Sequence, residues 1–329
     1  MEFFKAQFAK IPQIAPVNLS NCTVLITGAN AGIGFETARE ILKSKPKRLI
    51  LAVRNLDRGK TAVSRLAKTK AASTEIDVRQ LDQSSFTSVK AFADGLDGQN
   101  VDIAILNAGT WSFKWAQTTD GYENDLQVNV LSPALLSLLL LQNLRSAASA
   151  RAIGSDSPKP HLSFVSSGLH AMAKFPERKL PKGDILATLN DETKYDGADR
   201  YATTKLIGLL WAKEFASLAT SEQIVVNAPN PGFCKTSLLK DSSGAMKYMI
   251  KAFSVTMGRS PEDGAKCVVD AAIAKGDDSH GRYLSEAQLK SEADIARGEG
   301  AEQLQKTMWH EIVGILKERN VLPSGAESL

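Results

Sequence analysis

Cysteine is scarce in this 329-residue sequence, which has three thiols, at Cys22, Cys234 and Cys267. Thiols so few and so far apart form neither a disulfide framework nor a zinc site. We therefore expect a reducing compartment and place the protein in the cytoplasm. Histidine is equally rare, and the four histidines lack the spacing of metal ligands or of a catalytic triad. No bound metal is expected.

An excess of charge of one sign is also missing. Lysine and arginine together number 40, aspartate and glutamate number 36, and the formal net charge is +4. The basic residues are scattered along the chain, whereas a surface that binds nucleic acid needs them clustered. Nucleic acid is therefore not expected as a partner.

Long hydrophobic runs are absent as well. The most apolar run, "VLSPALLSLLLL" at 130–141, is shorter than the roughly 20 residues that a transmembrane helix needs. It predicts a buried or interface helix, so a homodimer surface and burial within one chain both remain open. Lysines interrupt the apolar residues of the first 20 positions, so this N-terminal arm (1–20) is not a secretory signal. We expect its apolar face to pack on the domain; the alternative is that this face lies on a membrane.

What the sequence does contain is a regular alternation of strand and helix patterns. Strands are predicted at 22–27, 48–53, 74–78, 101–107, 161–167, 223–229 and 281–284. Helices are predicted at about 33–45, after Asp57, and at 84–96, 121–149, 199–219, from 261 and at 299–320. This order predicts an α/β fold with a doubly wound parallel sheet of about seven strands. One domain over 21–329 is expected, with the last helix against the sheet or across the site.

A glycine-rich turn, "TGANAGIG" at 27–34, joins the first strand to the first helix. Residues without a Cβ let the main chain approach a pyrophosphate, and the helix N-terminus adds oriented N–H donors. The position of the turn, at the first strand–helix junction of a repeated βα pattern, predicts dinucleotide binding.

The end of the second strand indicates which dinucleotide is bound. The sequence "LAVRN" places Arg54 at the strand tip, and no carboxylate precedes Asp57. An arginine there pairs with a 2′-phosphate, whereas a carboxylate would accept hydrogen bonds from a ribose 2′-hydroxyl. NADP(H) is therefore favoured over NAD(H).

The stretch "YATTK" places Tyr201 and Lys205 on one face of a predicted helix. Free tyrosine has a pKa of about 10 and is a poor base at neutral pH. A nearby ammonium group favours the phenolate and lowers that pKa, so the pair is suited to proton transfer.

Taken together and in this order, the motifs Thr27-Gly28-x-x-x-Gly32-x-Gly34, Asn107-Ala108-Gly109, Asn129, Ser166-Ser167, Tyr201-x-x-x-Lys205 and Pro231-Gly232 resemble the short-chain dehydrogenase/reductase family. The resemblance covers about 22–285 and is greatest for the retinol-dehydrogenase-like branch and its fungal members. It implies a Rossmann-type doubly wound sheet with a C-terminal helical extension. The glycine spacing is that of the single-domain branch rather than the extended epimerase and dehydratase branch.

The resemblance also implies catalytic roles. Tyr201 would be the general acid in carbonyl reduction and the base in alcohol oxidation, and Lys205 would also bind the nicotinamide ribose. Ser167, rather than Ser166, would hydrogen-bond the substrate oxygen. Asn129 would hold a water in a proton relay to Lys205; the alternative is a polar residue that kinks its helix.

The cofactor contacts implied by the resemblance fall in the same motifs. Asp82 would meet the adenine amino group, with a plain helix cap as the alternative, and Cys234 would contribute a backbone contact. The full set is Gly28, Asn30, Gly32, Ile33, Gly34, Arg54, Asp82, Asn107, Ala108, Gly109, Tyr201, Lys205, Pro231, Gly232, Cys234 and Thr236.

The substrate side is expected in the loops near 168–200 and 234–260. Their apolar residues predict a hydrophobic substrate: Phe175, Tyr195, Met246, Tyr248, Met249 and Phe253. The aromatic residues Trp111, Phe113 and Trp115 wall the pocket or pack elsewhere.

The expected function is an NADP(H)-dependent oxidoreductase that interconverts a ketone or aldehyde and the corresponding alcohol on a hydrophobic small molecule, with secondary metabolite biosynthesis as its setting. The alternatives are a nucleotide-binding sensor or scaffold without turnover, and an epimerase or dehydratase.

Overall fold

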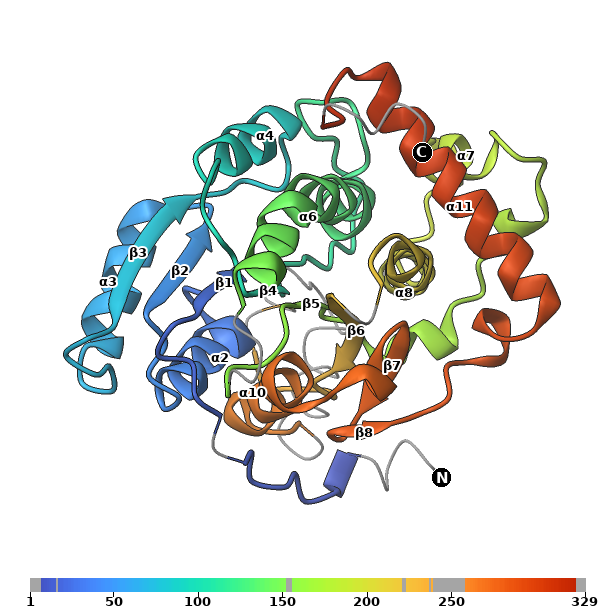
Figure 1. Ribbon diagram of the computed structural model, residues 1–329. Coiled ribbons are helices and arrows are strands. Elements are labelled where there is room, and N and C mark those ends of the chain that lie inside the picture. Colours follow the sequence, from blue (N-terminus) through green and yellow to red (C-terminus); the bar gives the residue numbers. More distant parts are fainter. Residues whose placement is uncertain are drawn as a thin grey trace.

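The computed structural model describes residues 7–15, 17–151, 156–220, 223–236, 238 and 258–323. Within these residues one sheet has eight strands in the order β3-β2-β1-β4-β5-β6-β7-β8 (Figure 1). The strands are β1 (Thr23–Thr27), β2 (Arg48–Val53), β3 (Glu75–Gln80), β4 (Ile103–Leu106), β5 (His161–Phe164), β6 (Val225–Asn230), β7 (Arg282–Ser285) and β8 (Gln288–Leu289). The first seven strands are parallel, as predicted, and β8 is antiparallel to β7.

The eighth strand is a difference from the sequence-based expectation of about seven. It is two residues long and follows β7 after a two-residue turn formed by Glu286 and Ala287, both with positive φ. Non-glycine residues rarely take that conformation, and "SEAQL" has no run of β-branched residues. No local sequence pattern therefore predicts this strand.

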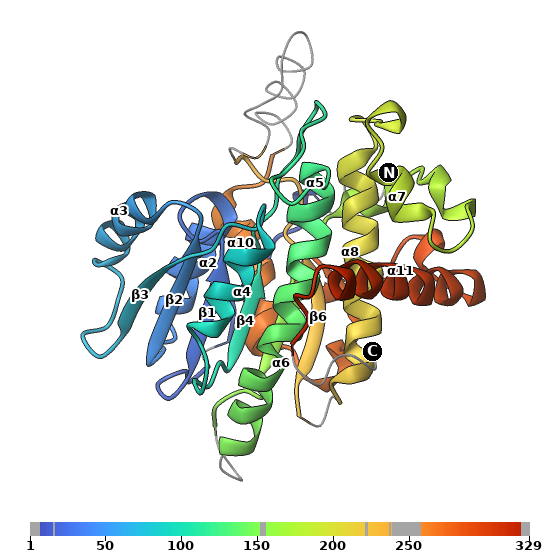
Figure 2. The ribbon, with the colours of Figure 1, turned by 90° about the horizontal axis from the view of Figure 1, so that it is seen from above.

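Helices cover both faces of the sheet (Figures 1 and 2). One face carries α2 (Gly32–Leu42), α3 (Leu56–Leu66) and α10 (Pro261–Val269), and the other carries α4 (Phe86–Asp94), α6 (Ser132–Ala150) and α8 (Arg200–Leu218). Side chains of a strand alternate between faces: Val24 and Ile26 join the core on the α2 side, and Leu25 joins the core on the α6 side. Burial on both faces explains why the strands read as continuous apolar runs.

The first residue of α3 differs from the expectation of a helix that opens after Asp57. The N-cap is Asn55, whose side-chain oxygen accepts a hydrogen bond from the backbone N–H of Arg58 at 2.9 Å. Asp57 lies inside the first turn, where a carboxylate is favoured by the helix dipole. The helix therefore begins directly behind the tip of β2.

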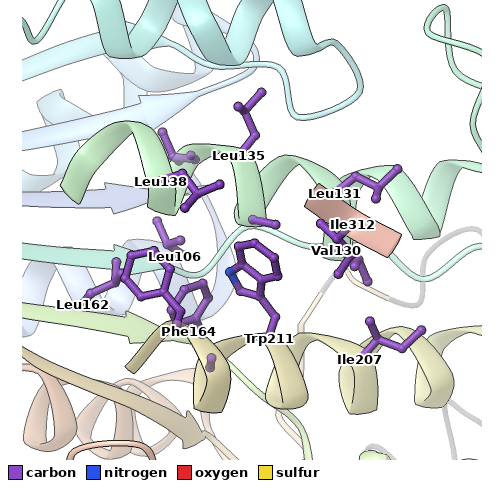
Figure 3. Packing of buried hydrophobic residues seen from close by; sticks show 14 of the residues in the cluster. Leu106, Val130, Leu131, Leu135, Leu138, Leu162, Phe164, Ile207, Trp211 and Ile312 are labelled. Atoms are coloured by element: carbon purple, nitrogen blue, oxygen red, sulfur yellow. The ribbon is translucent and has the colours of Figure 1, made fainter. Parts of the chain in front are cut away.

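The apolar run at 130–141 is explained by burial within one chain. Its leucines pack between α4, α8 and the sheet, and Figure 3 shows the indole of Trp211 on α8 turned towards α6. The helix that spans Asn124–Ala150 is long and apolar enough to cross a membrane, but 78% of its apolar window is buried inside the molecule. It is a core helix.

The C-terminal helix α11 (Glu299–Glu318) lies beside α8, neither on the sheet nor across the site (Figure 2). Trp309 stacks on Trp211, with ring centroids 4.2 Å apart. The carboxylate of Glu311 accepts hydrogen bonds from the backbone N–H groups of Gly183 and Leu186, each at 2.8 Å. The second of these residues lies in α7 (Ile185–Leu189), so α11 also anchors that helix.

Candidate active site

A cleft of about 1960 Å³ opens at the carboxyl ends of the parallel strands. It includes the switch point of the sheet between β1 and β4, since β2 and β3 extend the sheet on one side of β1 and the chain then crosses to β4 on the other side. Open α/β sheets bind ligands at such a point. All the expected cofactor-contacting residues line it, together with Ser167. Asn129 is the expected site residue that does not.

The glycine-rich turn has the shape that a pyrophosphate needs. Gly28 and Gly32 have φ values of +67° and +55°, which side-chain-bearing residues rarely adopt. A Cβ at Gly34 would lie 2.4 Å from the carbonyl oxygen of Gly28 and 2.5 Å from Nδ2 of Asn107. Only hydrogen fits there, so the helix α2 can start directly against the turn. Asn30 and Ile33 line the cleft beside these glycines.

The end of β4 is tied to the end of β1. Nδ2 of Asn107 donates to the carbonyl oxygen of Thr27 at 2.9 Å, and the backbone N–H of Ala108 donates to the Thr27 hydroxyl at 2.9 Å. A Cβ at Gly109 would lie 3.1 Å from Oδ1 of Asn129 and 3.6 Å from Nζ of Lys205. The main chain at Gly109 therefore packs closely against Asn129 and Lys205, between the glycine-rich turn and the helix that carries Tyr201.

Two arginines line the cleft at the tip of β2. Arg54 is the residue predicted from the sequence, and Arg58 in the first turn of α3 joins it. Arg58 was missed, although the sequence "RNLDR" shows a second cation one helical turn after the strand end. The pair offers two guanidinium groups to an anion at this end of the cleft.

Asp82 lines the cleft after β3. Its Oδ1 accepts hydrogen bonds from the backbone N–H and the hydroxyl of Ser84, at 2.9 and 2.7 Å. Ser85, not Asp82, is the N-cap of α4. The plain helix-cap alternative for Asp82 is therefore wrong, and its carboxylate lies in a local turn at the cleft wall.

Tyr201 and Lys205, both on α8, lie at the cleft with Ser167. Burial raises the pKa of the Tyr201 phenol, and a hydrogen bond with the Ser167 hydroxyl opposes that rise. This direction is opposite to the sequence-based expectation. Nζ of Lys205 lies 5.7 Å from the ring centroid of Tyr201 and donates to the carbonyl oxygen of Val165 at 2.9 Å. The loss of solvent around the phenol disfavours its charged form and dominates the shift of its pKa.

Burial also affects Lys205, because it disfavours the charged form of an amine. It lowers the pKa of Lys205 to about 8, and the carboxylate of Asp125 opposes this shift. Most of the amine is therefore still protonated at neutral pH.

Asn129 lies in a π-helical turn, η1 (Gln127–Leu131), between α5 (Asn124–Leu126) and α6. Its carboxamide pairs with the backbone of Thr110: Oδ1 accepts from the N–H and Nδ2 donates to the carbonyl oxygen, both at 2.8 Å. Nδ2 also donates to the hydroxyl of Thr204 at 3.1 Å. The side chain thus ties the loop after β4 to α8, and π-turns of this kind are frequent at functional sites.

Trp111 follows directly on that loop and stacks on Tyr201. The ring centroids are 4.4 Å apart and the planes differ by 9°. Phe113 also stacks on Trp111, with centroids 5.3 Å apart, whereas Trp115 meets Tyr195 edge to face. Of these three aromatic residues, Trp111 lines the cleft. Its indole fixes one face of the phenol ring.

A buried charged cluster lies behind the stacked rings and was not found from the sequence. The carboxylate of Asp125 accepts from the backbone N–H of Ser112 at 2.8 and 3.1 Å. Glu123 caps the start of α5, and its Oε2 lies 3.7 Å from Nε of Arg200, the first residue of α8. All three charged side chains are at most 2% exposed, and burial raises the pKa of Glu123 to about 7. The cluster joins the start of α8 to the start of α5.

Residues 230–236 form the opposite wall. Of these, Pro231, Gly232, Cys234 and Thr236 line the cleft, and Thr236 Cγ2 would lie 3.4 Å from a Cβ at Gly32, so the loop faces the glycine-rich turn. Burial raises the pKa of the Cys234 thiol to about 12, which makes it a poor nucleophile at neutral pH.

Two of the residues expected on the substrate side do not line the cleft. Phe175 is fully buried in the core, and its backbone N–H donates to Asp199. The Tyr195 hydroxyl donates to the carbonyl oxygen of Ser112 at 2.9 Å. Their roles are structural, because apolar residues in a loop serve the core as readily as a pocket. The remaining four, Met246, Tyr248, Met249 and Phe253, lie outside the described residues.

His170, to which the sequence assigned no role, lines the cleft. Its Nδ1 donates to the carbonyl oxygen of Ser167 at 2.7 Å, and its Nε2 accepts from the backbone N–H of Ala293 at 3.2 Å. These partners require the neutral ring, and burial lowers the pKa of His170 accordingly. The ring joins the Ser167 turn to the C-terminal wall of the cleft.

Comparison with known proteins identifies the family. A family model described as short chain dehydrogenase matches residues 22–175. A short chain dehydrogenase of Arthrobotrys oligospora is 37% identical over 91% of this chain and 94% of its own length. The short-chain dehydrogenase anuD of Penicillium roqueforti is 34% identical over 97% of this chain and 84% of its own length.

Solved structures share the fold. An NADPH-bound carbonyl reductase from chicken fatty liver superposes with a TM-score of 0.61 at 17% identity, covering 86% of this chain and 99% of the reductase. L-sorbose reductase from Gluconobacter frateurii, solved with NADPH and L-sorbose, gives 0.60 at 20% identity, covering 83% of this chain and 98% of that enzyme. With its fungal relatives and its matching sheet, the chain belongs to the short-chain dehydrogenase/reductase family of oxidoreductases.

Proposed function

We propose that the protein is an NADP(H)-dependent oxidoreductase that interconverts a ketone or aldehyde and the corresponding alcohol on a hydrophobic small molecule. The observation that carries this proposal is the convergence of Tyr201, Lys205 and Ser167 on the same cleft as the glycine-rich turn. A dinucleotide bound on that turn extends towards the hydroxyl pair, where a carbonyl group can be reduced.

The residues of the cleft fit a dinucleotide. Gly34 leaves no room for a side chain between the turn and Asn107, so the pyrophosphate meets main chain and the N-terminus of α2. Arg54 and Arg58 offer paired guanidinium groups where a 2′-phosphate would lie. The structural relatives from chicken and Gluconobacter hold NADPH, which supports the same choice here. When bound, NADPH supplies the hydride.

The proton comes from the chain itself. Because burial raises the pKa of Tyr201, the phenol is protonated at neutral pH and can donate to a carbonyl oxygen. The Ser167 hydroxyl is the second donor to that oxygen and stabilises the negative charge that develops on it. Lys205, held by the carbonyl oxygen of Val165, keeps a positive charge beside the phenol. This arrangement suits donation of a proton to a carbonyl oxygen.

The lining supports an apolar substrate. The apolar side chains among the described lining residues include Trp111, Leu169, Phe233 and Leu238. An indole stacked on the acid favours a flat, apolar group next to the reacting carbonyl. A role in secondary metabolite biosynthesis and a cytoplasmic location stay predictions.

The decisive experiment is reduction of a panel of apolar ketones with NADPH by wild-type protein and Tyr201→Phe. Loss of the acid should lower kcat by about 10²–10⁴-fold, while nicotinamide fluorescence shows that the variant still binds NADPH. Wild-type protein that binds NADPH but turns over no ketone or aldehyde would favour a sensor. A Tyr201→Phe rate close to wild type would show that another group is the acid.

A further inference from the structure

The N-terminal arm reaches the cleft through Gln7. Its Nε2 donates to the carbonyl oxygen of Phe233 at 2.7 Å, and its Oε1 accepts from the backbone N–H of Phe233 at 3.1 Å. The two residues are 226 positions apart, and Gln7 is 6% exposed. The carboxamide therefore pairs with the Phe233 main chain as the backbone of a neighbouring strand would. Each partner donates one hydrogen bond and accepts one.

Arg259 completes the attachment from the other side. Its guanidinium group donates to the carbonyl oxygens of Pro231 at 3.0 Å and of Gln7 at 3.5 Å. A Cβ at Gly232 would lie 2.8 Å from Nη1 of Arg259 and 3.3 Å from Oε1 of Gln7. The loop thus lies in a cradle formed by the arm and Arg259, and Gly232, with φ at +79°, is the residue that fits it.

The arm is fixed further along as well. Ile11 is 7% exposed and packs with Cys267 and Ala287, whereas Phe8 between the two anchors is 67% exposed. Gln7 lines the same cleft as Tyr201. The arm is therefore a part of the cleft wall on the side of the 231–236 loop.

We propose that Gln7 is a positioning residue for the nicotinamide half of the cofactor. It fixes the peptide of Phe233 and, through it, the flanking residues Pro231, Gly232, Cys234 and Thr236. The inference rests on the proposed function and on the family resemblance, which implies that this loop meets the nicotinamide carboxamide. The adenosine half of the cleft, at Arg54 and Asp82, has no contact with Gln7 in the hydrogen bonds of the described residues, so the effect of Gln7 is confined to one end of the ligand.

The test compares two ligands that differ in the nicotinamide. Gln7→Met keeps the length and apolar contacts of the side chain and removes both hydrogen bonds to Phe233. The expected Kd for NADPH rises about tenfold, the size of one to two net hydrogen bonds. The Kd for 2′-phospho-ADP-ribose, which lacks the nicotinamide, stays within about twofold of wild type. Gln7→Ala should act in the same direction with a larger loss of thermal stability.

Phe8→Ala is the matched control, because it changes an exposed side chain of the same arm. Both Kd values should stay at wild type in this variant. Equal weakening of both ligands by Gln7→Met would mean a general loosening of the cleft and would overturn the inference, as would unchanged binding of both. Binding decides these outcomes without turnover, so wild-type protein that binds NADPH but reduces nothing would refute the proposed function alone.

Discussion

The nucleotide side of the cleft is shaped by main chain, whereas the tyrosine side is shaped by buried side chains. At Gly28 and Gly34 the turn can pack closely because these residues have no Cβ. Around Tyr201 the fit comes from an indole on the ring and from charges behind it, with Asp125 holding the loop that carries Trp111. A turn made of backbone is readable in sequence as glycine spacing, but a side-chain network exists only after folding.

This difference predicts that the nucleotide side has no tolerance for added volume. Gly34→Ala places a Cβ where 2.4 Å separates it from the carbonyl oxygen of Gly28, so we expect NADPH binding to be lost and the free energy of unfolding to fall by about 1–3 kcal/mol or more. Gly314→Ala in α11 is the control, because its Cβ meets nothing within 4 Å. It should stabilise the protein by up to about 1 kcal/mol. Calorimetry and cofactor fluorescence measure both; full NADPH affinity in Gly34→Ala would refute the view of a closed turn.

At the outer end of the nucleotide side, near Arg54 and Arg58, charge rather than shape should determine the preference for NADPH over NADH. Arg54→Ala and Arg58→Ala should each weaken NADPH by about tenfold, since each removes a charge-assisted contact, and should change NADH binding little. The double variant should bind the two cofactors about equally. Titration of both reduced cofactors by fluorescence tests this, and parallel losses for NADPH and NADH would exclude a 2′-phosphate site.

The smallest effect that we expect is on the tyrosine side, as a shift in the pH dependence of ketone reduction. Lys205 has its pKa lowered to about 8; its charge is present below that pH and lost above it, so ketone reduction should fall as pH rises through about 8. Asp125 raises the pKa of Lys205, so Asp125→Asn should move this limb to lower pH. A kcat/KM profile across the neutral and alkaline range measures the shift. An unmoved limb would mean that Asp125 acts on the Trp111 loop alone.

The features of the fold and the site that the sequence predicts are those formed by local patterns, and the features it does not predict are contacts between distant segments. Seven strands, the glycine-rich turn and the Tyr201–Lys205 spacing are local patterns, and each lies where it was expected. The pairing of Gln7 with Phe233 and the stacking of Trp111 on Tyr201 join distant segments. No local sequence pattern therefore predicts either contact. The direction of the Tyr201 pKa was wrong for a related reason: burial depends on the whole fold.

Trp309 on Trp211 has a consequence for assembly. The helix that carries Tyr201 and Lys205 has its outer side occupied by the chain's own last helix. A second copy that sought this side of α8 would first have to displace α11, along with the Glu311 contacts to Gly183 and Leu186. This side of α8 is therefore closed to a second copy while α11 stays in place.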